Sequence, residues 1–423
     1  MNLDWHRLKA VVLESDDWGL CAWVPDEHAF RVLADTPAFR SPAGRHYGRS
    51  TLECADDIGR LVEMLLEFRG GDGFPPVMQA NTVMAAPDFA QLSPPQFECD
   101  VLPLVHYPEF ASRWHRPGLA TAVRKACESG VWWPELHGLA HVPQAAWLRA
   151  LRRGTADARR AHEHECFVCE AVEASGEYDP SEPPEQRTRS LALAVERFVA
   201  VFGRAPGSFC APDYRWDARL ETDAEGLGLT TFQGIAERKG HPFPRIRHLL
   251  HQYRWPHTRG HRFYLPPRIA FEHRGGMAPA ARVGTTAAHR AARRAWGRGQ
   301  PAIVSSHRLN YAYLDPAWSE GGRKALRDLL WLLARDGATF LTDAEVRSLS
   351  ERAWSARPVG ERGTLFRYYG VPGAPVRLAA PVGVEGVTLA EHSTAEGARF
   401  TVEGGEISAE VNPGEYLLEW RRA

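Results

Sequence analysis

Two short groups of polar residues in the first third of the chain have the composition of a divalent-metal site. Asp16 and Asp17 are adjacent carboxylates that follow the apolar run 10–13, whose short, β-branched composition predicts a buried strand. Two carboxylates this close repel each other, so a cation or a shared proton has to accompany them. His137 and His141 follow another predicted strand, and histidines four residues apart can chelate one cation. The alternative interpretation is an acidic loop and a pair of structural histidines.

Three of these residues suffice for a catalytic rather than a structural metal site. If both predicted strands end at the same rim, Asp17, His137 and His141 supply three N/O ligands. Coordination positions then remain for water and substrate, as in a hydrolytic centre.

The composition is that of an ordinary globular protein with no dominant charge. The chain has 423 residues, of which 44% are hydrophobic and 24% are charged, which favours one large domain and a smaller one. Lys and Arg number 51 and Asp and Glu number 52, so the net charge is −1 and argues against nucleic acid as the main partner. The Arg-rich stretch 282–298 therefore predicts a solvated helix face.

Cysteine usage and the absence of long apolar runs predict a cytoplasmic protein. The seven cysteines are odd in number and scattered, which favours reduced thiols over a disulfide framework. The first residues show no basic segment followed by an apolar one, so we expect no signal peptide. No apolar run approaches the length of a membrane span. Residues 162–169 have a metal-binding composition but only one Cys-x2-Cys pair, so we expect a helix with partly buried thiols there.

Short apolar strands and amphipathic helices alternate over most of the chain. Helices are predicted at 55–68, 119–129 and 323–335, with another ending at Gly203 and a short one after Thr342. Alternation at this spacing implies parallel pairing through right-handed crossovers. We therefore predict an α/β fold, a distorted (β/α)7-8 barrel with the site at the C-terminal ends of the strands, and an open doubly wound sheet as the alternative. Strands are predicted at 10–13, 76–84, 131–136, 207–210, 229–235, 263–269, 302–305 and 338–341.

The pattern of apolar and polar residues changes near residue 360. Short alternating runs separated by Gly, Pro and Asn predict a small antiparallel β unit of the sandwich kind. We therefore place a (β/α) barrel domain at 1–355 and a C-terminal β domain at 356–423.

Four segments along the chain form an ordered set of motifs. Residues 15–19 end a strand with two aspartates, and residues 137–141 place two histidines four apart. Residues 210–215 contain Ala-Pro-Asp-Tyr-Arg, and a later strand ends at His307. In this order they resemble the polysaccharide deacetylases, which remove acetyl groups from N-acetylated sugars. That family has an Asp-Asp strand end, a His-Ser/Thr-x-x-His motif, an Arg-x-Pro-Tyr/Phe motif and a late catalytic histidine. The resemblance covers about residues 8–347.

The resemblance implies a distorted (β/α) barrel and a set of catalytic roles. Asp17, His137 and His141 would hold a divalent metal, for which we expect zinc, with cobalt, nickel, manganese or iron as alternatives. Asp16 would act as the general base on a metal-activated water, and His307 would protonate the leaving amine.

The third motif departs from the family pattern. The resemblance implies that the backbone N–H of Tyr214 helps to stabilise the oxyanion. Ala211, or Cys210 if the motif is shifted by one residue, stands where the family has arginine, and we expect Arg215 to supply the cation beside Asp16. We expect the substrate to contact side chains close to these motifs: Trp18, Asn81, Asp213, Arg308, Asn310 and Tyr311.

These observations favour a metal-dependent amidohydrolase that removes an N-acetyl group from an N-acetylated sugar or glycan precursor. Gly138, where the family has a hydroxyl residue, and the altered third motif leave a second hypothesis open. In that hypothesis the same fold and metal hydrolyse a non-sugar amide or an ester. A third hypothesis is a non-catalytic carbohydrate-binding protein, against which the complete set of candidate residues argues. The expected partner is a carbohydrate or another acylated small molecule.

Overall fold

The structure is a computed structural model of the whole chain. It describes residues 3–94, 97–99, 101–172, 176–240, 243–275, 278–360, 363–379, 384–389, 399–403 and 406–422. Within these residues, no helix combines the length and the apolar character needed to cross a bilayer.

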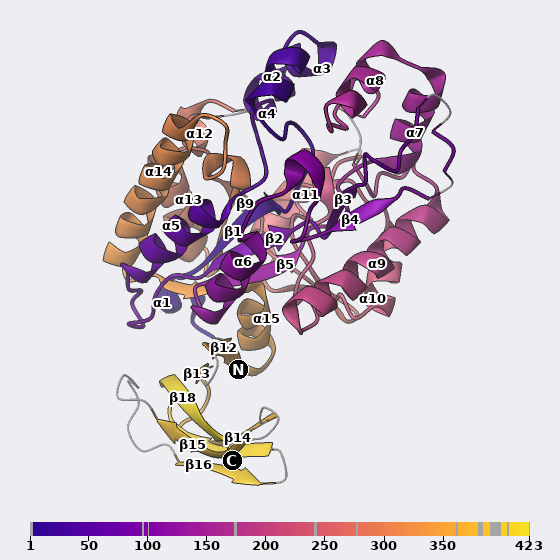
Figure 1. Cartoon of the computed structure of the whole chain (residues 1–423). Helices are drawn as coiled ribbons and strands as arrows, with labels where there is room; N and C mark the ends of the chain where they lie inside the picture. Colours follow the sequence, from indigo (N-terminus) through magenta and orange to yellow (C-terminus); the bar gives the residue numbers. More distant parts are fainter. Residues whose placement is uncertain are drawn as a thin grey trace.

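A mostly parallel β-sheet forms the centre of the molecule (Figure 1). Its strand β1 is flanked by β2 and β10, and β11 pairs with the first residues of β1. The apolar residues of β1 are buried, as expected for a parallel strand covered on both faces. The order β5-β2-β1-β10-β9 is formed by β5 (Trp132–Leu136), β2 (Met78–Thr82), β1 (Ala10–Trp18), β10 (Ala302–His307) and β9 (Arg268–Ala270), with β11 (Thr339–Leu341) beside β1.

The sheet continues beyond β5 through a single residue. Phe209 bridges in parallel to Leu136 and to Phe232, which belongs to β6 (Thr231–Phe232). Strand β8 (Arg262–Tyr264) pairs in parallel with β6 and antiparallel with β7 (His257–Arg259). The predicted α/β class and the parallel central sheet are confirmed. Strands β8 and β9 follow each other closely in the chain and pair with β6 and β10, but closure into a (β/α) barrel stays a prediction.

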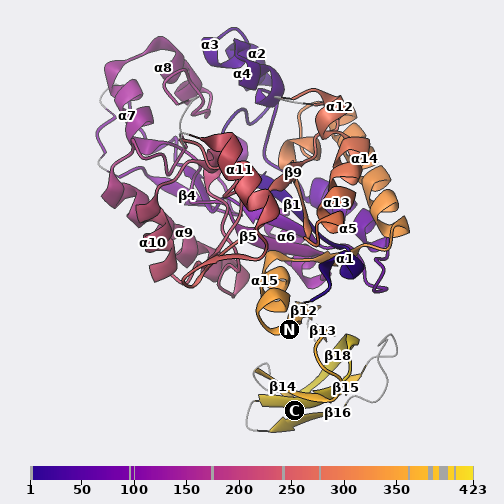
Figure 2. The ribbon, with the colours of Figure 1, turned by 180° about the vertical axis from the view of Figure 1, so that it is seen from behind.

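Helices surround the sheet in both views (Figures 1 and 2). The predicted helices 55–68 and 119–129 correspond to α5 (Ala55–Leu66) and α6 (Leu119–Glu128). The helix predicted at 323–335 is the second half of α14 (Pro316–Arg335), which begins earlier because Asp315 caps its N-terminus. The remaining helices of the layer are α1 (Trp5–Leu8), α9 (Pro184–Phe202), α10 (Ala218–Gly226), α11 (Pro244–Tyr253), α12 (Ala280–Val283), α13 (Thr285–Gly297) and α15 (Asp343–Arg352).

Short elements gather at the end of the molecule opposite to the C-terminal strands (Figures 1 and 2). These are α2 (Glu27–Leu33), α3 (Pro37–Arg40), α4 (Pro42–Tyr47), α7 (Gln144–Arg153) and α8 (Ala156–Glu163), and the hairpin β3 (Ala85–Pro87) and β4 (Leu104–His106) lies on the side of the sheet. Helix α8 ends at Glu163 and residues 166–169 are not helical, so the predicted helix over 162–169 was wrong for its second half.

The C-terminal strands form two antiparallel sheets, as the alternating pattern predicted. One contains β12 (Trp354–Val359), β13 (Gly363–Tyr368), β18 (Gly414–Arg422) and β15 (Val384–Leu389), and the other contains β14 (Ala374–Ala379), β17 (Glu406–Val411) and β16 (Arg399–Glu403). Phe366, Ile407 and Leu418, contributed by both sheets, belong to one buried apolar cluster. The domain boundary at 355/356 stays a prediction.

A buried charge network connects the C-terminal strands to the α/β part. Arg367 of β13 donates to Asp72 at 2.7 Å and to Glu345 of α15, and all three side chains are buried. Arg357 of β12 donates to the same Glu345 at 3.1 Å. Removing one partner from such a network leaves uncompensated buried charge.

We therefore expect Arg367→Met to lower the free energy of unfolding by about 3–5 kcal/mol, measured by chemical denaturation. The control is Arg377→Met, because Arg377 on β14 forms a 3.7 Å pair with Glu406 and its side chain is 74% exposed. That change should cost less than about 1 kcal/mol. Equal losses in the two variants would contradict a structural role for the buried network.

Candidate functional site

Asp16 and Asp17 both line one cavity of about 440 Å³ at the C-terminal end of β1. Neighbouring residues of a regular strand point to opposite faces, so a local break is required. Asp17 supplies it with φ +73°, and the register between β1 and β2 shifts between Ser15 and Trp18. This irregularity brings two consecutive carboxylates to the same cavity.

The three predicted metal ligands lie together at this cavity. The Asp17 Oδ1 atom is 3.3 Å from His137 Nε2 and 3.7 Å from His141 Nε2. One ligand atom from each residue lies within 4.8 Å of the other two. His137 Nδ1 is 2.9 Å from the Cys210 carbonyl, which fixes the proton on Nδ1 and leaves the Nε2 lone pair facing Asp17. Two imidazole nitrogens and a carboxylate oxygen are the donor set of a catalytic zinc site.

The electrostatics of this cluster favour a positive charge. Burial lowers the pKa of His137, but Asp16 and Asp17 outweigh burial and raise that pKa above its usual value. The carboxylates thus stabilise a cation where the ligand atoms converge, which fits a divalent metal.

Glu177 holds the loop that carries both histidines. Its Oε2 accepts hydrogen bonds from the backbone N–H groups of Leu139, Ala140 and His141 at 3.0, 3.1 and 3.0 Å. Gly138 has φ +101°, and a Cβ at this residue would lie 2.8 Å from Glu177 Oε2. A side chain at position 138 would therefore collide with the carboxylate that shapes the loop. This contact and the positive φ explain why position 138 is a glycine.

Arg268 of β9 forms a two-bond ion pair with Asp16. The Nη1–Oδ2 and Nη2–Oδ1 distances are 2.7 and 2.8 Å. The same guanidinium also bonds to Glu14 and, at 2.6 Å, to the Tyr214 hydroxyl. Burial raises the pKa of the Asp16 carboxyl, but Arg268 and nearby histidines outweigh burial and hold that pKa well below its usual range. Asp16 is therefore an ionised and fixed carboxylate at neutral pH.

The prediction that Arg215 lies beside Asp16 was wrong. Arg215 donates to Asp179 at 2.9 Å, and Arg268 takes the place beside Asp16. Arg215 follows a 3-10 turn at Pro212–Tyr214, and its N–H donates to the Pro212 carbonyl at 3.2 Å. Arg268, the arginine beside Asp16, belongs to β9, which pairs with β10 in the sheet.

The proposed oxyanion role of the Tyr214 backbone does not fit the structure either. Its N–H donates to the carbonyl of Ala211 at 3.1 Å and is part of the same turn. Tyr214 lines the cavity, and its hydroxyl is bonded to Arg268. The side chain, rather than the backbone, therefore acts on the Asp16–Arg268 pair.

Asn81 positions Asp16 instead of contacting substrate. Its Nδ2 donates to Asp16 Oδ1 at 2.6 Å and to Gln233 Oε1 at 2.8 Å, and its side chain is fully buried. The predicted strand does end beside Asn81, but the side-chain amide of Asn81 faces Asp16 and is closed to a ligand.

The two aromatic substrate contacts predicted near the motifs belong to the core. Trp18 is buried and packs edge-on against Trp132, with ring centroids 4.6 Å apart. Tyr311 is also buried, and its hydroxyl donates to Ser306 at 3.1 Å. Both predictions were wrong because the residues lie next to cavity residues in sequence but point into the packed layer.

Of the three polar substrate contacts predicted after the motifs, one lines the cavity. Asp213 does so, beside Tyr214. Arg308 is buried in an ion pair with Glu53 at 3.0 Å, and Asn310 is buried and donates to the His307 carbonyl at 3.1 Å. Arg308 and Asn310 stabilise the turn after β10 and are not open to a substrate.

His307 faces the same cavity from the end of β10. The parallel register places it opposite Asp16. Its Nδ1 lies 2.5 Å from Glu272 Oε1. Burial lowers the pKa of His307, but Glu272 outweighs burial and raises it to about 9. The imidazole is therefore protonated at neutral pH and can donate a proton from Nε2.

Replacing Glu272 by glutamine is expected to shift the pH profile. The change removes the charge that raises the pKa of His307, so the imidazolium deprotonates at lower pH. The alkaline limb of kcat/KM should move down by about 1–2 pH units, measured on the released product. An unchanged alkaline limb would show that His307 is not the proton donor.

The remaining cavity wall is largely apolar. Leu20, Trp23, Phe167, Val168 and Val172 belong to this lining. Phe167 and Val168 lie between Cys166 and Cys169, which are buried free thiols, whereas the sequence predicted partly buried ones. Tyr47, Asp213 and Lys239 add polar groups to the cavity lining.

Three residues of the site escaped the sequence analysis: Glu177, Arg268 and Glu272. Glu177 lies in a Pro-rich acidic loop, and nothing in the sequence connects it to the histidines. Arg268 carried a usable signal, because it is a charged residue inside a predicted apolar strand and so requires a buried counter-charge. Glu272 follows that strand closely, where the C-terminal ends of the parallel strands meet.

Comparison with known proteins gives a distant likeness in fold. No protein-family model matches the sequence, and a search of curated proteins finds no match. A Mycobacterium smegmatis protein assigned as a polysaccharide deacetylase is 14% identical, with 80% of this chain and 90% of that chain covered and a TM-score of 0.39. A CE4 family pseudoenzyme from Bacillus anthracis is 9% identical, with 80% of this chain and 65% of that chain covered and a TM-score of 0.31. A 4-alpha-glucanotransferase from Thermococcus litoralis is 10% identical, with 80% of this chain and 40% of that chain covered and a TM-score of 0.41. Any function must therefore be argued from the site.

Proposed function

We propose that this protein is a metal-dependent hydrolase that removes an N-acyl group, first of all acetyl, from an amino sugar or glycan precursor. The observation that carries the proposal is the meeting of two groups in one cavity. Asp17, His137 and His141 offer a ligand set, and an ionised Asp16 and a protonated His307 face the same space. A base and an acid beside a metal site are what amide hydrolysis needs.

Asp17, His137 and His141 would hold the ion, with zinc as the proposed metal. When bound, a divalent cation polarises the acyl carbonyl and lowers the pKa of a water. The protein itself contributes the cavity that admits the substrate and the buried strands that close the site on the side of the sheet.

Asp16 accepts a proton from the attacking water. Arg268 and Asn81 hold its two oxygens, so the carboxylate needs no reorientation during the reaction. A carboxylate with so low a pKa is a weak base, which suits only a water that is already acidified.

His307 donates a proton to the leaving nitrogen. The amine is a poor leaving group unless it is protonated, and the Glu272 pair keeps the imidazole charged at neutral pH. Glu272 also fixes the ring by binding Nδ1, which leaves Nε2 for the substrate.

A second candidate substrate class is favoured by the apolar wall. Trp23, Phe167 and Val172 offer more apolar surface than an acetyl methyl can use. An amide with a longer or aromatic acyl group, on a sugar or on another amine, would bury that group against the wall.

A panel of N-acyl glucosamines and N-acetylated chito-oligosaccharides tests the proposal. Each compound is incubated with the zinc-loaded protein, and the released carboxylic acid and amine are quantified. Release of acetate supports the sugar deacetylase, and a preference for longer acyl groups supports the second class. Binding of the oligosaccharide with no acid released from any compound would contradict both and indicate a carbohydrate-binding protein.

A further inference from the structure

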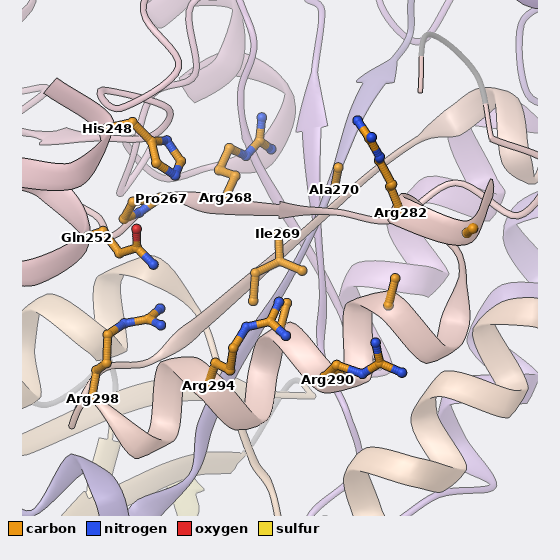
Figure 3. A pocket seen from close by; sticks show the side chains of 13 residues that line it. His248, Gln252, Pro267, Arg268, Ile269, Ala270, Arg282, Arg290, Arg294 and Arg298 are labelled. Atoms are coloured by element: carbon orange, nitrogen blue, oxygen red, sulfur yellow. The ribbon is translucent and has the colours of Figure 1, made fainter. Parts of the chain in front are cut away.

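A second cavity, of about 400 Å³, lies between α11 and α13 and is floored by β9. Figure 3 shows Arg290, Arg294 and Arg298 along one side and His248 and Gln252 of α11 on the other. Arg282 closes a further side of the same groove (Figure 3). Arg268 also borders it, but its guanidinium is engaged with Asp16 and Glu14. The groove therefore gathers positive charge outside the candidate active site.

The spacing of the arginines explains why they meet. Arg290, Arg294 and Arg298 follow one another at intervals of four residues, so the helical repeat puts them on one face. Two small residues of the same helix, Ala287 and Ala291, also line the groove and leave it open.

These charges have no acidic partners in the groove. Within the part of the chain that the structure describes, no ion pair joins Arg282, Arg290, Arg294 or Arg298 to a carboxylate. The adjacent Arg293 differs, because it does not line the groove and lies 3.7 Å from Asp336.

The arginines and His248 oppose one another's charge. Burial lowers the pKa of Arg298, Tyr253 opposes this shift and Arg294 adds to it; burial and Arg298 lower the pKa of His248. An acidic group, Glu237, lies 3.8 Å from His248 Nδ1. Like charges at four-residue spacing destabilise a helix, and a bound anion would remove that cost.

We propose that this groove binds a phosphate-bearing ligand. A guanidinium presents paired N–H donors that match phosphate oxygens, and several of them around one groove match a diphosphate or a phosphorylated sugar. The groove is too small for a nucleic-acid duplex, and the net charge of −1 gives the protein no general affinity for polyanions. The site is independent of the proposed hydrolysis.

Two sources can supply this phosphate. One is a soluble small molecule, and the other is a phospholipid headgroup. Helix α11 suggests the phospholipid headgroup, because exposed apolar side chains beside a basic groove are typical of a membrane-binding surface. On this helix Ile246, Leu249 and Leu250 are 57%, 52% and 63% exposed.

The first arm of the test is calorimetric titration of the full chain with inorganic pyrophosphate at low ionic strength. We expect a Kd on the order of 100 µM that weakens with added salt. Arg290→Gln and Arg294→Gln should each weaken binding about tenfold, because each removes a charged hydrogen-bond donor. Arg293→Gln removes the same charge from a neighbouring residue of α13 that does not line the groove and is paired with Asp336, so it should leave the Kd unchanged. Thermal melting of each variant checks that it is folded.

The second arm is co-sedimentation with phosphatidylcholine vesicles that contain about one-third phosphatidylglycerol. Pyrophosphate binding that depends on Arg290 and Arg294 supports a soluble ligand. Vesicle binding alone supports a headgroup, provided that Arg294→Gln and Leu250→Ser each weaken it. Binding to neither probe, or an equal loss in Arg293→Gln, would overturn the proposal.

Discussion

Replacing Asp16 by asparagine is expected to lower kcat by about 10²–10⁴-fold while the bound metal stays in place. Asparagine keeps the shape of the side chain but cannot accept a proton from water. The proposed ligands are Asp17, His137 and His141, so the variant should lose activity and keep the metal content of the wild type. The measurement is kcat for acyl release with the metal content determined on the same sample.

Asp213→Asn is the matched control for this prediction. Asp213 lines the same cavity, and the substitution removes the same charge without touching the Arg268 pair. We expect a change in KM and a kcat within about tenfold of the wild type. The substitution should alter binding of the ground state and the transition state equally, without a specific loss of transition-state stabilisation. Normal turnover by Asp16→Asn would exclude Asp16 as the base.

Replacing Arg268 by methionine is expected to reduce both activity and stability. Asp16 and Glu14 are buried and would lose their shared cation, which should lower the free energy of unfolding by about 3–5 kcal/mol. The pKa of Asp16 should rise, because Arg268 is the main group that lowers it. Since the base must be ionised, the acid limb of kcat/KM should move to higher pH, and kcat should fall by about 10²-fold or more.

Two further variants separate positioning from a general loss of stability. Arg268→Lys keeps the charge but not the two parallel bonds, so it should recover stability more than activity. Arg215→Met breaks a partly exposed pair with Asp179 and should leave the acid limb in place. A shift of the acid limb in Arg215→Met, and none in Arg268→Met, would contradict the assignment of Arg268.

The sequence was most informative where apolar periodicity and strand ends decide the structure. The buried run 10–13 and the helix 55–68 were found because a parallel strand and an amphipathic helix have distinct patterns. The positions of Asp16, Asp17, His137, His141 and His307 at one cavity follow from the same logic, since parallel strands end at one edge.

The sequence was least informative about which side chain completes an electrostatic pair. Arg215 belongs to the third motif and is therefore the arginine that the sequence suggests, whereas Arg268 reaches Asp16 through the pairing of β9 with β10. Sequence proximity also misplaced Trp18 and Tyr311, which point into the packed layer. The direction of a side chain after an irregular strand end depends on backbone angles such as the positive φ of Asp17.

The number of zinc ions bound per chain tests the central claim most directly. Elemental analysis of protein dialysed against micromolar zinc should give about one ion per chain for the wild type. His141→Gln should lose most of that zinc, because it removes one of three ligands. His164→Gln should keep it, because His164 belongs to the other metal-like cluster of the sequence. Zinc that is absent from the wild type, or lost in His164→Gln and retained in His141→Gln, would contradict the account.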